Sequence, residues 1–172
     1  MADFVYSDHY LEAIAGRDPM PVHERYFEMM RYLANVAPED KLPGRQHIDP
    51  LDFSQFMPLI NLMDVEHVDG DVRFRFRLVG TEQIRRGGRE ITGMLVEDAL
   101  VPELVPRVQA NMRRVLKIRG PVFDSFPLPQ PHREFVPSQR MYFPLASDGE
   151  AIDMLLTLNG YDPDAALSPK SG

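Results

Sequence analysis

Residues 63–76 read MDVEHVDGDVRFRF, and the dipeptide Asp69-Gly70 lies at the centre of this stretch. Asp-Gly favours a two-residue β-hairpin turn, because both positions tolerate positive φ. Folding the chain about this turn places apolar residues on one face and opposite charges on the other. The expected pairs are Val65 with Phe74, Met63 with Phe76, Glu66 with Arg73 and Asp64 with Arg75. A slip of one residue would destroy both patterns, so the stretch predicts a hairpin in this register.

A second dipeptide of the same kind, Asp148-Gly149, predicts another hairpin near the end of the chain. The same type of turn would gather apolar residues on one face, pairing Leu145 with Ile152, Phe143 with Met154 and Met141 with Leu156. Pro144 cannot donate a ladder hydrogen bond, so it predicts an edge, a bulge or a neighbouring strand that ends early. A fifth strand is expected near Val122–Phe126, between Pro121 and Pro127.

Helical spacing of apolar residues occurs in two longer segments. Residues 22–36 carry the stripe Val22, Tyr26, Met29, Met30, Leu33 and Val36. A helix over 103–118 would turn inward Leu104, Val108, Met112, Val115 and Leu116. Shorter helices are expected over 7–15, from Asp49-Pro50 to Phe56, over 81–86 and in the segment that ends at Leu100. Strands and helices do not alternate as in parallel sheets. The order therefore predicts an α+β domain, a five-stranded antiparallel sheet with helices on one face, plus an N-terminal helical extension.

The chain has 172 residues, of which 44% are hydrophobic, and this suits one domain with a substantial core. It contains no Cys, which excludes disulfides, thiolate metal sites and cysteine nucleophiles. The formal net charge of −7 disfavours nucleic acid as a partner. No signal peptide is visible, and no apolar run approaches the roughly 20 residues that span a bilayer. We therefore expect a cytoplasmic protein without a membrane partner.

Several short segments follow one another in a distinctive order: LPGR at 42–45 with IDP at 48–50, LMDVE at 62–66, FRFRLVGT at 74–81 and REITG at 89–93. This ordered set resembles a bacterial family of small stand-alone PAS proteins over about residues 40–160. The resemblance implies a PAS-like domain at 39–162, with a helical extension at 1–38 and a flexible tail at 163–172. It also implies a sensor, a dimerisation unit or an interaction module, with no catalytic residues.

The resemblance raises the question of cofactors. Haem-binding PAS domains typically place a histidine on or near the long helix, and residues 103–118 contain none. Flavin photosensors of this fold use a reactive cysteine, which the chain lacks, although a flavin held without covalent chemistry stays open. No two of the five histidines lie at i, i+4 beside a carboxylate. We expect no cofactor and no metal.

Two groups of residues are candidates for binding. An apolar wall between the sheet and the helices would hold a small apolar ligand; it comprises Met63, Phe74, Phe76, Met141, Phe143, Met154 and Leu156. The candidates for binding an anion are Arg85, Arg86, Arg89, Arg113 and Arg114. The alternatives are an ordinary core for the first group and solvated faces for the second.

Candidates for acid–base chemistry are few. Asp64 and Glu66 form a carboxylate pair on one strand face, but the arginines opposite would hold both ionised. His67 is expected at the inward edge of the same strand. The chain has no nucleophile elbow, phosphate loop or dinucleotide fingerprint.

We therefore predict a non-enzymatic sensor or regulator that binds a small ligand or a regulatory partner protein. Homodimerisation is expected through the apolar stripe of residues 22–36, part of which would stay exposed. Two alternatives remain open. One is a small α+β enzyme or carrier that acts on an apolar carbonyl compound in its cavity, and the other is a regulator that binds an anion or nucleotide.

Overall fold

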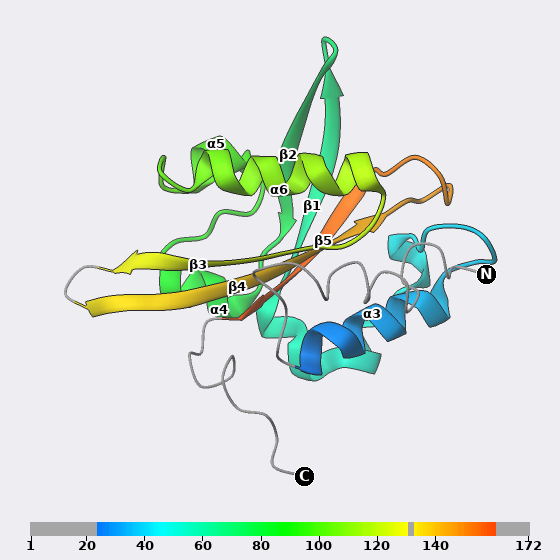
Figure 1. Ribbon diagram of the computed structural model, residues 1–172, viewed down its shortest axis with the longest axis horizontal. Helices are drawn as coiled ribbons and strands as arrows, with labels where there is room; N and C mark the ends of the chain where they lie inside the picture. Colours follow the sequence, from blue (N-terminus) through cyan, green and yellow to red (C-terminus); the bar gives the residue numbers. More distant parts are fainter. Residues whose placement is uncertain (1–23, 131–132, 161–172) are drawn as a thin grey trace.

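The computed structural model describes residues 24–130 and 133–160 of the chain. Its elements, in chain order, are α3 (Glu24–Val36), η1 (Arg45–His47), η2 (Pro50–Leu59), β1 (Ile60–Val68), β2 (Asp71–Leu78), α4 (Thr81–Gly87), α5 (Val96–Ala99), α6 (Val105–Ile118), β3 (Val122–Gln130), β4 (Arg133–Leu145) and β5 (Met154–Gly160). The strands form one antiparallel sheet in the order β2-β1-β5-β4-β3 (Figure 1). The expected α+β fold with a five-stranded antiparallel sheet is confirmed.

The β1–β2 hairpin has the register that the Asp-Gly turn predicts, with all four expected pairs in place. Asp69 and Gly70 both adopt positive φ, at 50° and 81°, as a type I′ turn requires. The ion pairs, however, are diagonal. Arg75 binds Glu66 at 2.6 Å and Arg77 binds Asp64 at 2.7 Å, because long side chains reach the diagonal neighbour across a strand pair.

The second hairpin differs from its prediction by two residues. Leu145 pairs with Met154 and Phe143 pairs with Leu156, so the expected pairing of Phe143 with Met154 is wrong. The Asp148 carboxylate accepts hydrogen bonds from the backbone N–H of Glu150 and Ala151, both at 2.8 Å, which widens the turn. Within the turn the Gly149 N–H donates to the Ala146 carbonyl at 3.1 Å, and both residues also bind the connector at 42–43. A shift of two preserves the alternation of the strand, so the apolar residues still share one face.

Prolines mark the free edge of the sheet, as their missing N–H requires. β3 is an edge strand and runs to Gln130, through Pro127, where we expected it to end. Pro144 lies on β4 beyond the start of β3, whose Val122 pairs with Tyr142. The neighbouring strand thus stops short of Pro144, which is one of the three arrangements that the sequence predicts.

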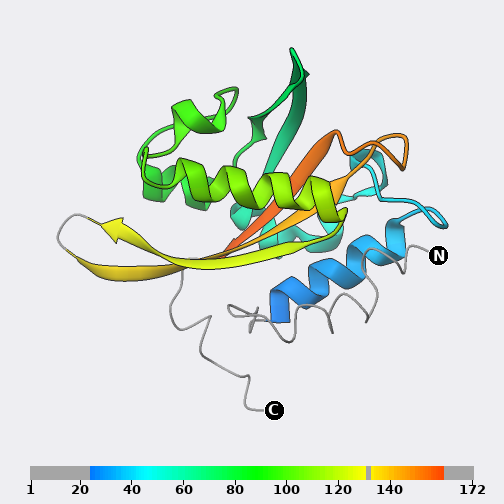
Figure 2. The same cartoon turned by 45° about the horizontal axis from the view of Figure 1, so that its top comes forward.

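The sheet carries a different layer on each face. On β3, Asp124 accepts hydrogen bonds from α6, whereas the ring of its neighbour Phe123 lies 5.4 Å from that of Tyr26 on α3. Figures 1 and 2 show α6 and α3 on opposite sides of the sheet. We call the face toward α6 the inner face and the face toward α3 the outer face. The α6 residues buried on the inner side are Val108, Met112 and Val115.

The helix α3 belongs to the hydrophobic core. Tyr26, Met29, Met30 and Leu33 are at most 1% exposed. The expectation that part of this stripe stays exposed for a dimer contact is therefore wrong for these residues. The charged pairs of the outer face lie on the first hairpin, whereas α3 packs over the other side of the sheet, where Tyr26 contacts Phe123. Homodimerisation itself and a domain boundary at residue 38 stay predictions.

The shorter helices begin close to where the sequence predicts. The Asp49 side chain caps η2 by accepting from the N–H of Leu51 at 3.0 Å. α4 follows Gly80 rather than a Thr81 side-chain cap, and Gly88 ends it with φ of 73°. The helix expected over 7–15, Val22 and the tail at 163–172 lie outside the described residues.

Candidate functional site

The expected apolar wall is divided between the two faces of the sheet. Met63 pairs with Leu155, and Leu62 pairs with Leu156, so Met63 and Leu156 point to opposite sides. The inner face carries Met63, Phe74 and Phe76, and the outer face carries Met141, Phe143, Met154 and Leu156. The interpretation of one continuous wall is therefore wrong. Each turn predicts the faces of its own hairpin, but the relative phase of the two hairpins depends on the pairing of β1 with β5.

The inner face instead carries a band of buried polar side chains. Two cross-strand rows form it, because Thr157 pairs with both Asn61 and Tyr142, and Arg140 pairs with both Asn159 and Asp124. All six residues are at most 6% exposed. We call this set the polar band: Asn61, Asp124, Arg140, Tyr142, Thr157 and Asn159.

Some polar atoms of the band have partners and others do not. Asn61 accepts from the N–H of Gly80 at 2.8 Å and donates to Gln83 on α4. Asn159 donates to the carbonyl of Leu59 at 2.9 Å. Within the described residues, the Tyr142 hydroxyl, the Thr157 hydroxyl and the Asn159 Oδ1 are buried without a hydrogen-bond partner. Buried polar groups are nearly always paired with protein, water or ligand, so these atoms mark a candidate binding site.

Asp124 joins the polar band to α6. It accepts hydrogen bonds from Arg107 Nε at 2.6 Å, from Arg107 Nη2 at 2.7 Å and from Asn111 Nδ2 at 2.7 Å. Burial by itself raises the pKa of this carboxyl, but the hydrogen bonds and the charge of Arg107 together lower the pKa below its ordinary value. Asp124 is therefore an ionised anchor for the helix and not a proton donor.

The predicted anion-binding arginines are placed differently from one another. Arg85 and Arg86 both form ion pairs with Glu82. The pKa of Glu82 is lowered to about 2, mainly by the hydrogen bond from Arg85. Arg89 donates to the carbonyls of Asp98 and Ala99 at the end of α5. These three arginines thus have structural partners. Two candidates, Arg113 and Arg114, lie on the exposed side of α6.

The groups considered for acid–base chemistry lie away from the polar band. His67 pairs with Val72 on the same face as Met63 and Val65, as expected, but it is exposed near the tip of the first hairpin instead of lying at the edge of the core. The hairpin tip extends beyond α6 (Figure 1). Asp64 and Glu66 lie in surface ion pairs, and the hydrogen bond from Arg75 lowers the pKa of Glu66. The described segments contain no cluster of His, Asp or Glu placed to hold a metal ion.

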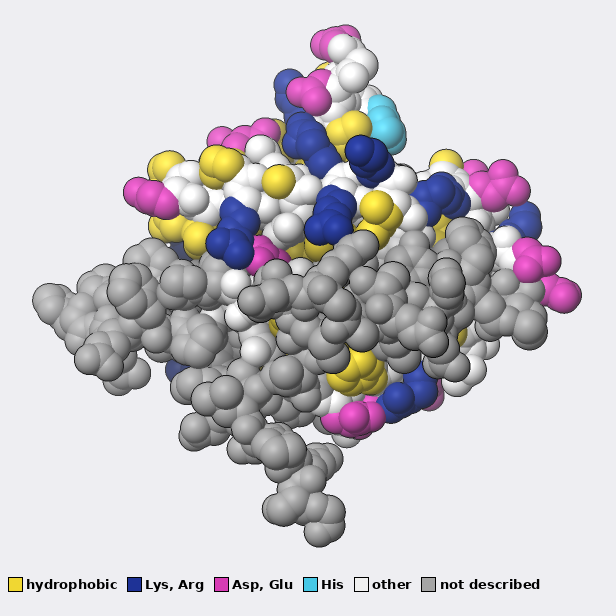
Figure 3. Space-filling model, in the orientation of Figure 1, with side chains coloured by type: hydrophobic (Ala, Val, Ile, Leu, Met, Phe, Trp, Pro, Cys, Tyr) yellow, Lys and Arg dark blue, Asp and Glu magenta, His cyan; other side chains and the backbone are white. Residues whose placement is uncertain are grey.

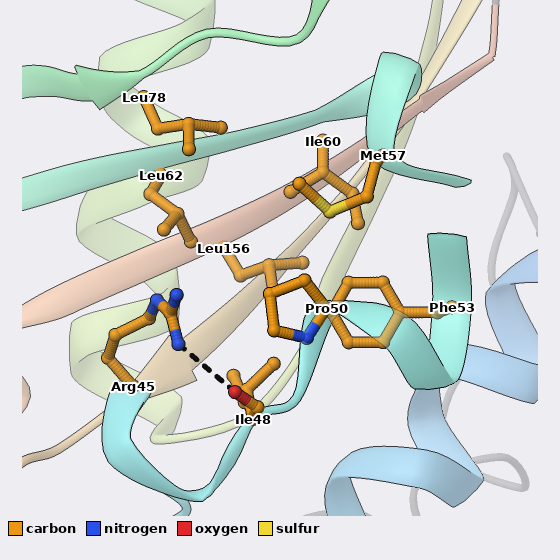
Figure 4. A pocket seen from close by; sticks show the side chains of 9 residues that line it. All are labelled: Arg45, Ile48, Pro50, Phe53, Met57, Ile60, Leu62, Leu78 and Leu156. Atoms are coloured by element: carbon orange, nitrogen blue, oxygen red, sulfur yellow. Dashed lines mark hydrogen bonds between the residues drawn. The ribbon is translucent and has the colours of Figure 1, made fainter. Parts of the chain in front are cut away.

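A small apolar pocket lies on the outer face (Figure 4). Its walls come from the connector before η2, from η2 itself and from β1, β2 and β5, and Arg45 donates to the Ile48 carbonyl at its rim. The volume is about 20 Å³, which is the room of about one water molecule. Of the expected wall, only Leu156 lines it. This pocket is much smaller than typical ligand sites.

Sequence reasoning missed the polar band, although β5 contains a signal for it. Thr157 and Asn159 alternate with Leu156 and Leu158 in the stretch MLLTLNG. Strict alternation of polar and apolar residues ordinarily indicates a solvated face. Because both faces of this sheet are covered, the polar residues are instead buried.

The chain is a small α+β domain. The inner face of its antiparallel sheet packs against short helices and one long helix, with polar groups between them. The family model described as PAS domain matches residues 22–158. The chain therefore belongs to the PAS domain family, which is typical of sensory signalling modules.

The solved structures that resemble this chain have low sequence identity to it. The light-state LOV domain of the blue-light photoreceptor Aureochrome1 has a TM-score of 0.46 and 13% identity, and the match covers 67% of this chain and 90% of that one. The PAS domain of BvgS from Bordetella pertussis has a TM-score of 0.46 and 18% identity, with 72% and 90% covered. The Rhodobacter sphaeroides LOV protein has a TM-score of 0.45 and 14% identity, with 72% and 71% covered. No curated protein matches the chain.

None of the helices in the described segments has the length and apolar character that a bilayer crossing needs.

Proposed function

We propose that this chain is a non-enzymatic sensory module that holds a small ligand against the polar band and acts on a regulatory protein partner. The observation that carries the proposal is the set of buried, unpartnered atoms on Tyr142, Thr157 and Asn159. Leaving a buried donor or acceptor unsatisfied costs about 1–3 kcal/mol each. A ligand or ordered water that meets these atoms would remove that cost.

The side chains of the inner face suggest the chemistry of the ligand. The Asn159 Oδ1 requires a donor, and the two hydroxyls can donate or accept. The same face carries Phe74 and Phe76, which offer apolar and aromatic contact. We therefore propose a small ligand that combines apolar surface with at least one N–H or O–H group, in place of the purely apolar ligand expected from the sequence.

The polar band favours binding over catalysis. Asp124, its only carboxylate, is ionised and already hydrogen-bonded to Arg107 and Asn111. The band contains no histidine, so it lacks a group that is matched to proton transfer near neutral pH. The proposal thus differs from the alternative of a cavity enzyme, which requires a titrating group beside its substrate.

Native mass spectrometry of the purified full chain, with and without the Thr157→Val substitution, tests the proposal. Valine has nearly the shape of threonine but lacks the hydroxyl. The free energy of unfolding of the unliganded variant should therefore exceed that of the parent by about 1 kcal/mol. The parent should retain a small molecule that T157V retains at least tenfold less. The matched control is Met141→Leu on the outer face, which should retain the ligand like the parent. Absence of any bound molecule from the parent, together with a loss of stability in T157V, would assign the hydroxyl a structural role and remove the proposal.

A further inference from the structure

The outward side of α6 carries only positive charge. Opposite its buried residues, the exposed positions are Pro106, Arg107, Ala110, Arg113, Arg114 and Lys117. α3, α4 and α5 each include at least one acidic residue, whereas α6 has none. Figure 3 shows Lys and Arg side chains spaced along this helix. We call Arg107, Arg113, Arg114 and Lys117 the α6 basic face.

Internal contacts account for only part of this face. Arg107 binds Asp124, and Arg113 lies 3.5 Å from Asp71 and donates to the carbonyl of Val72 at 3.2 Å. Arg114 and Lys117 have no ion pair among the described residues. Lys117 lies in the last helical turn, where the helix dipole favours a cation. Like charges at i, i+3 and i, i+4 repel one another, however, so Lys117 is destabilised by both Arg114 and Arg113.

We propose that the α6 basic face docks a short acidic peptide segment of a partner protein. From Arg107 to Lys117 the face covers eleven residues of helix, which rise about 15 Å along its axis. That length matches about four or five residues of extended peptide. Pro106 and Ala110 are small and exposed beside the cations, so the backbone of a peptide can approach the helix closely.

The charge of the whole chain favours a short acidic segment over a nucleic acid. The chain has a net charge of −7 with 26 acidic residues, and the four cations of the basic face are local. At physiological salt, charges are screened beyond about 8 Å. A short segment confined to α6 is therefore attracted by the cations and screened from distant acids, whereas a long polyanion would extend onto acidic surface. This docking site touches the polar band only through the ion pair of Arg107 with Asp124, and it does not depend on a ligand there.

The test uses the full chain and a synthetic octapeptide that alternates Glu and Ala and carries a neutral fluorophore. Fluorescence anisotropy measures its affinity for the parent, for the double variant Arg114→Glu/Lys117→Glu and for the control Arg31→Glu/Arg73→Glu. Both variants change the net charge equally, and the control residues are exposed but lie on α3 and β2. We expect the α6 variant to bind about tenfold more weakly or worse, since like-charge contacts at an interface are strongly unfavourable, and the control to bind within threefold of the parent.

Two further measurements give the test a definite outcome. Backbone amide NMR shifts of the parent should change over Val105–Ile118 when the peptide is added. Equal losses in both double variants, or shift changes centred elsewhere, would refute the site. An eight-nucleotide single strand that binds the parent at least as tightly as the peptide, and loses affinity in the α6 variant, would assign the face to nucleic acid and overturn the proposed partner.

Discussion

Replacing Asp124 with asparagine removes the carboxylate that ties α6 to the edge strand β3. The native carboxylate accepts three hydrogen bonds, from Arg107 Nε at 2.6 Å, Arg107 Nη2 at 2.7 Å and Asn111 Nδ2 at 2.7 Å. An asparagine keeps one acceptor oxygen, so the bonds that depend on the second oxygen and on the charge are lost. A hydrogen bond to a charged group contributes about 1.5–3 kcal/mol. The Arg107 side chain is 48% exposed, and water therefore compensates part of its loss.

We accordingly expect Asp124→Asn to lower the free energy of unfolding by about 2 kcal/mol at pH 7. For a chain of this size that corresponds to a fall in Tm of about 6 °C. The assay is urea unfolding followed by circular dichroism, since the chain has no Trp. The matched control is Asp71→Asn, because the Asp71 side chain is 73% exposed and loss of its charge should leave the unfolding curve unchanged.

The pH dependence provides an independent check. The pKa of Asp124 is lower in the folded protein than its ordinary value, because the bonds from Arg107 and Asn111 outweigh the effect of burial. A lowered folded-state pKa means that the stabilisation is fully present above the unfolded pKa of about 3.9 and is lost as the pH falls through the folded pKa. The difference between the parent and D124N should stay constant from pH 5 to 8 and shrink below about pH 4. A deficit under about 0.5 kcal/mol at pH 7, or one of equal size at pH 3, would refute the reasoning.

Two further substitutions test the packing. Gly80→Ala should lower the free energy of unfolding by about 2 kcal/mol, because the new Cβ would clash with the Pro58 carbonyl oxygen. The control is Gly87→Ala on α4, where the new Cβ meets nothing within 4 Å; this variant should be neutral or stabilising in the same urea assay. Leu33→Ala should cost about 2–4 kcal/mol by leaving a cavity beneath α3. The loss of unfolding free energy in this variant should be the same at every protein concentration. A loss that grows on dilution would indicate that Leu33 lies in a dimer interface.

The prediction of homodimerisation shows where sequence reasoning lost information. The charges at Asp64 and Glu66 on the first hairpin suggested an outer face with few apolar partners for the 22–36 helix. In the structure that helix lies over the other end of the sheet, where Tyr26 meets Phe123. Helical periodicity indicates which residues a helix buries, but it does not specify the surface against which they pack.

The sequence alone determines the local geometry of this protein. Asp69-Gly70 specifies the β1–β2 register to the residue, because a one-residue slip would expose Val65 and Phe74 and bury their charged neighbours. The spacing of Val108, Met112 and Val115 likewise identifies the buried side of α6. In each case the residues that interact are close in the chain, so one turn or one helical period suffices.

The candidate site depends on contacts between distant segments, and only the tertiary structure determines it. Pairing of β1 with β5 sets the phase between the two hairpins and brings Asn61 beside Thr157. Contact of α6 with β3 then brings Arg107 and Asn111 to Asp124. No local turn and no helical periodicity in the sequence specifies either contact, because each depends on the burial of whole surfaces. For that reason the alternating polar residues of β5, which on a solvated strand would be unremarkable, become a buried polar band.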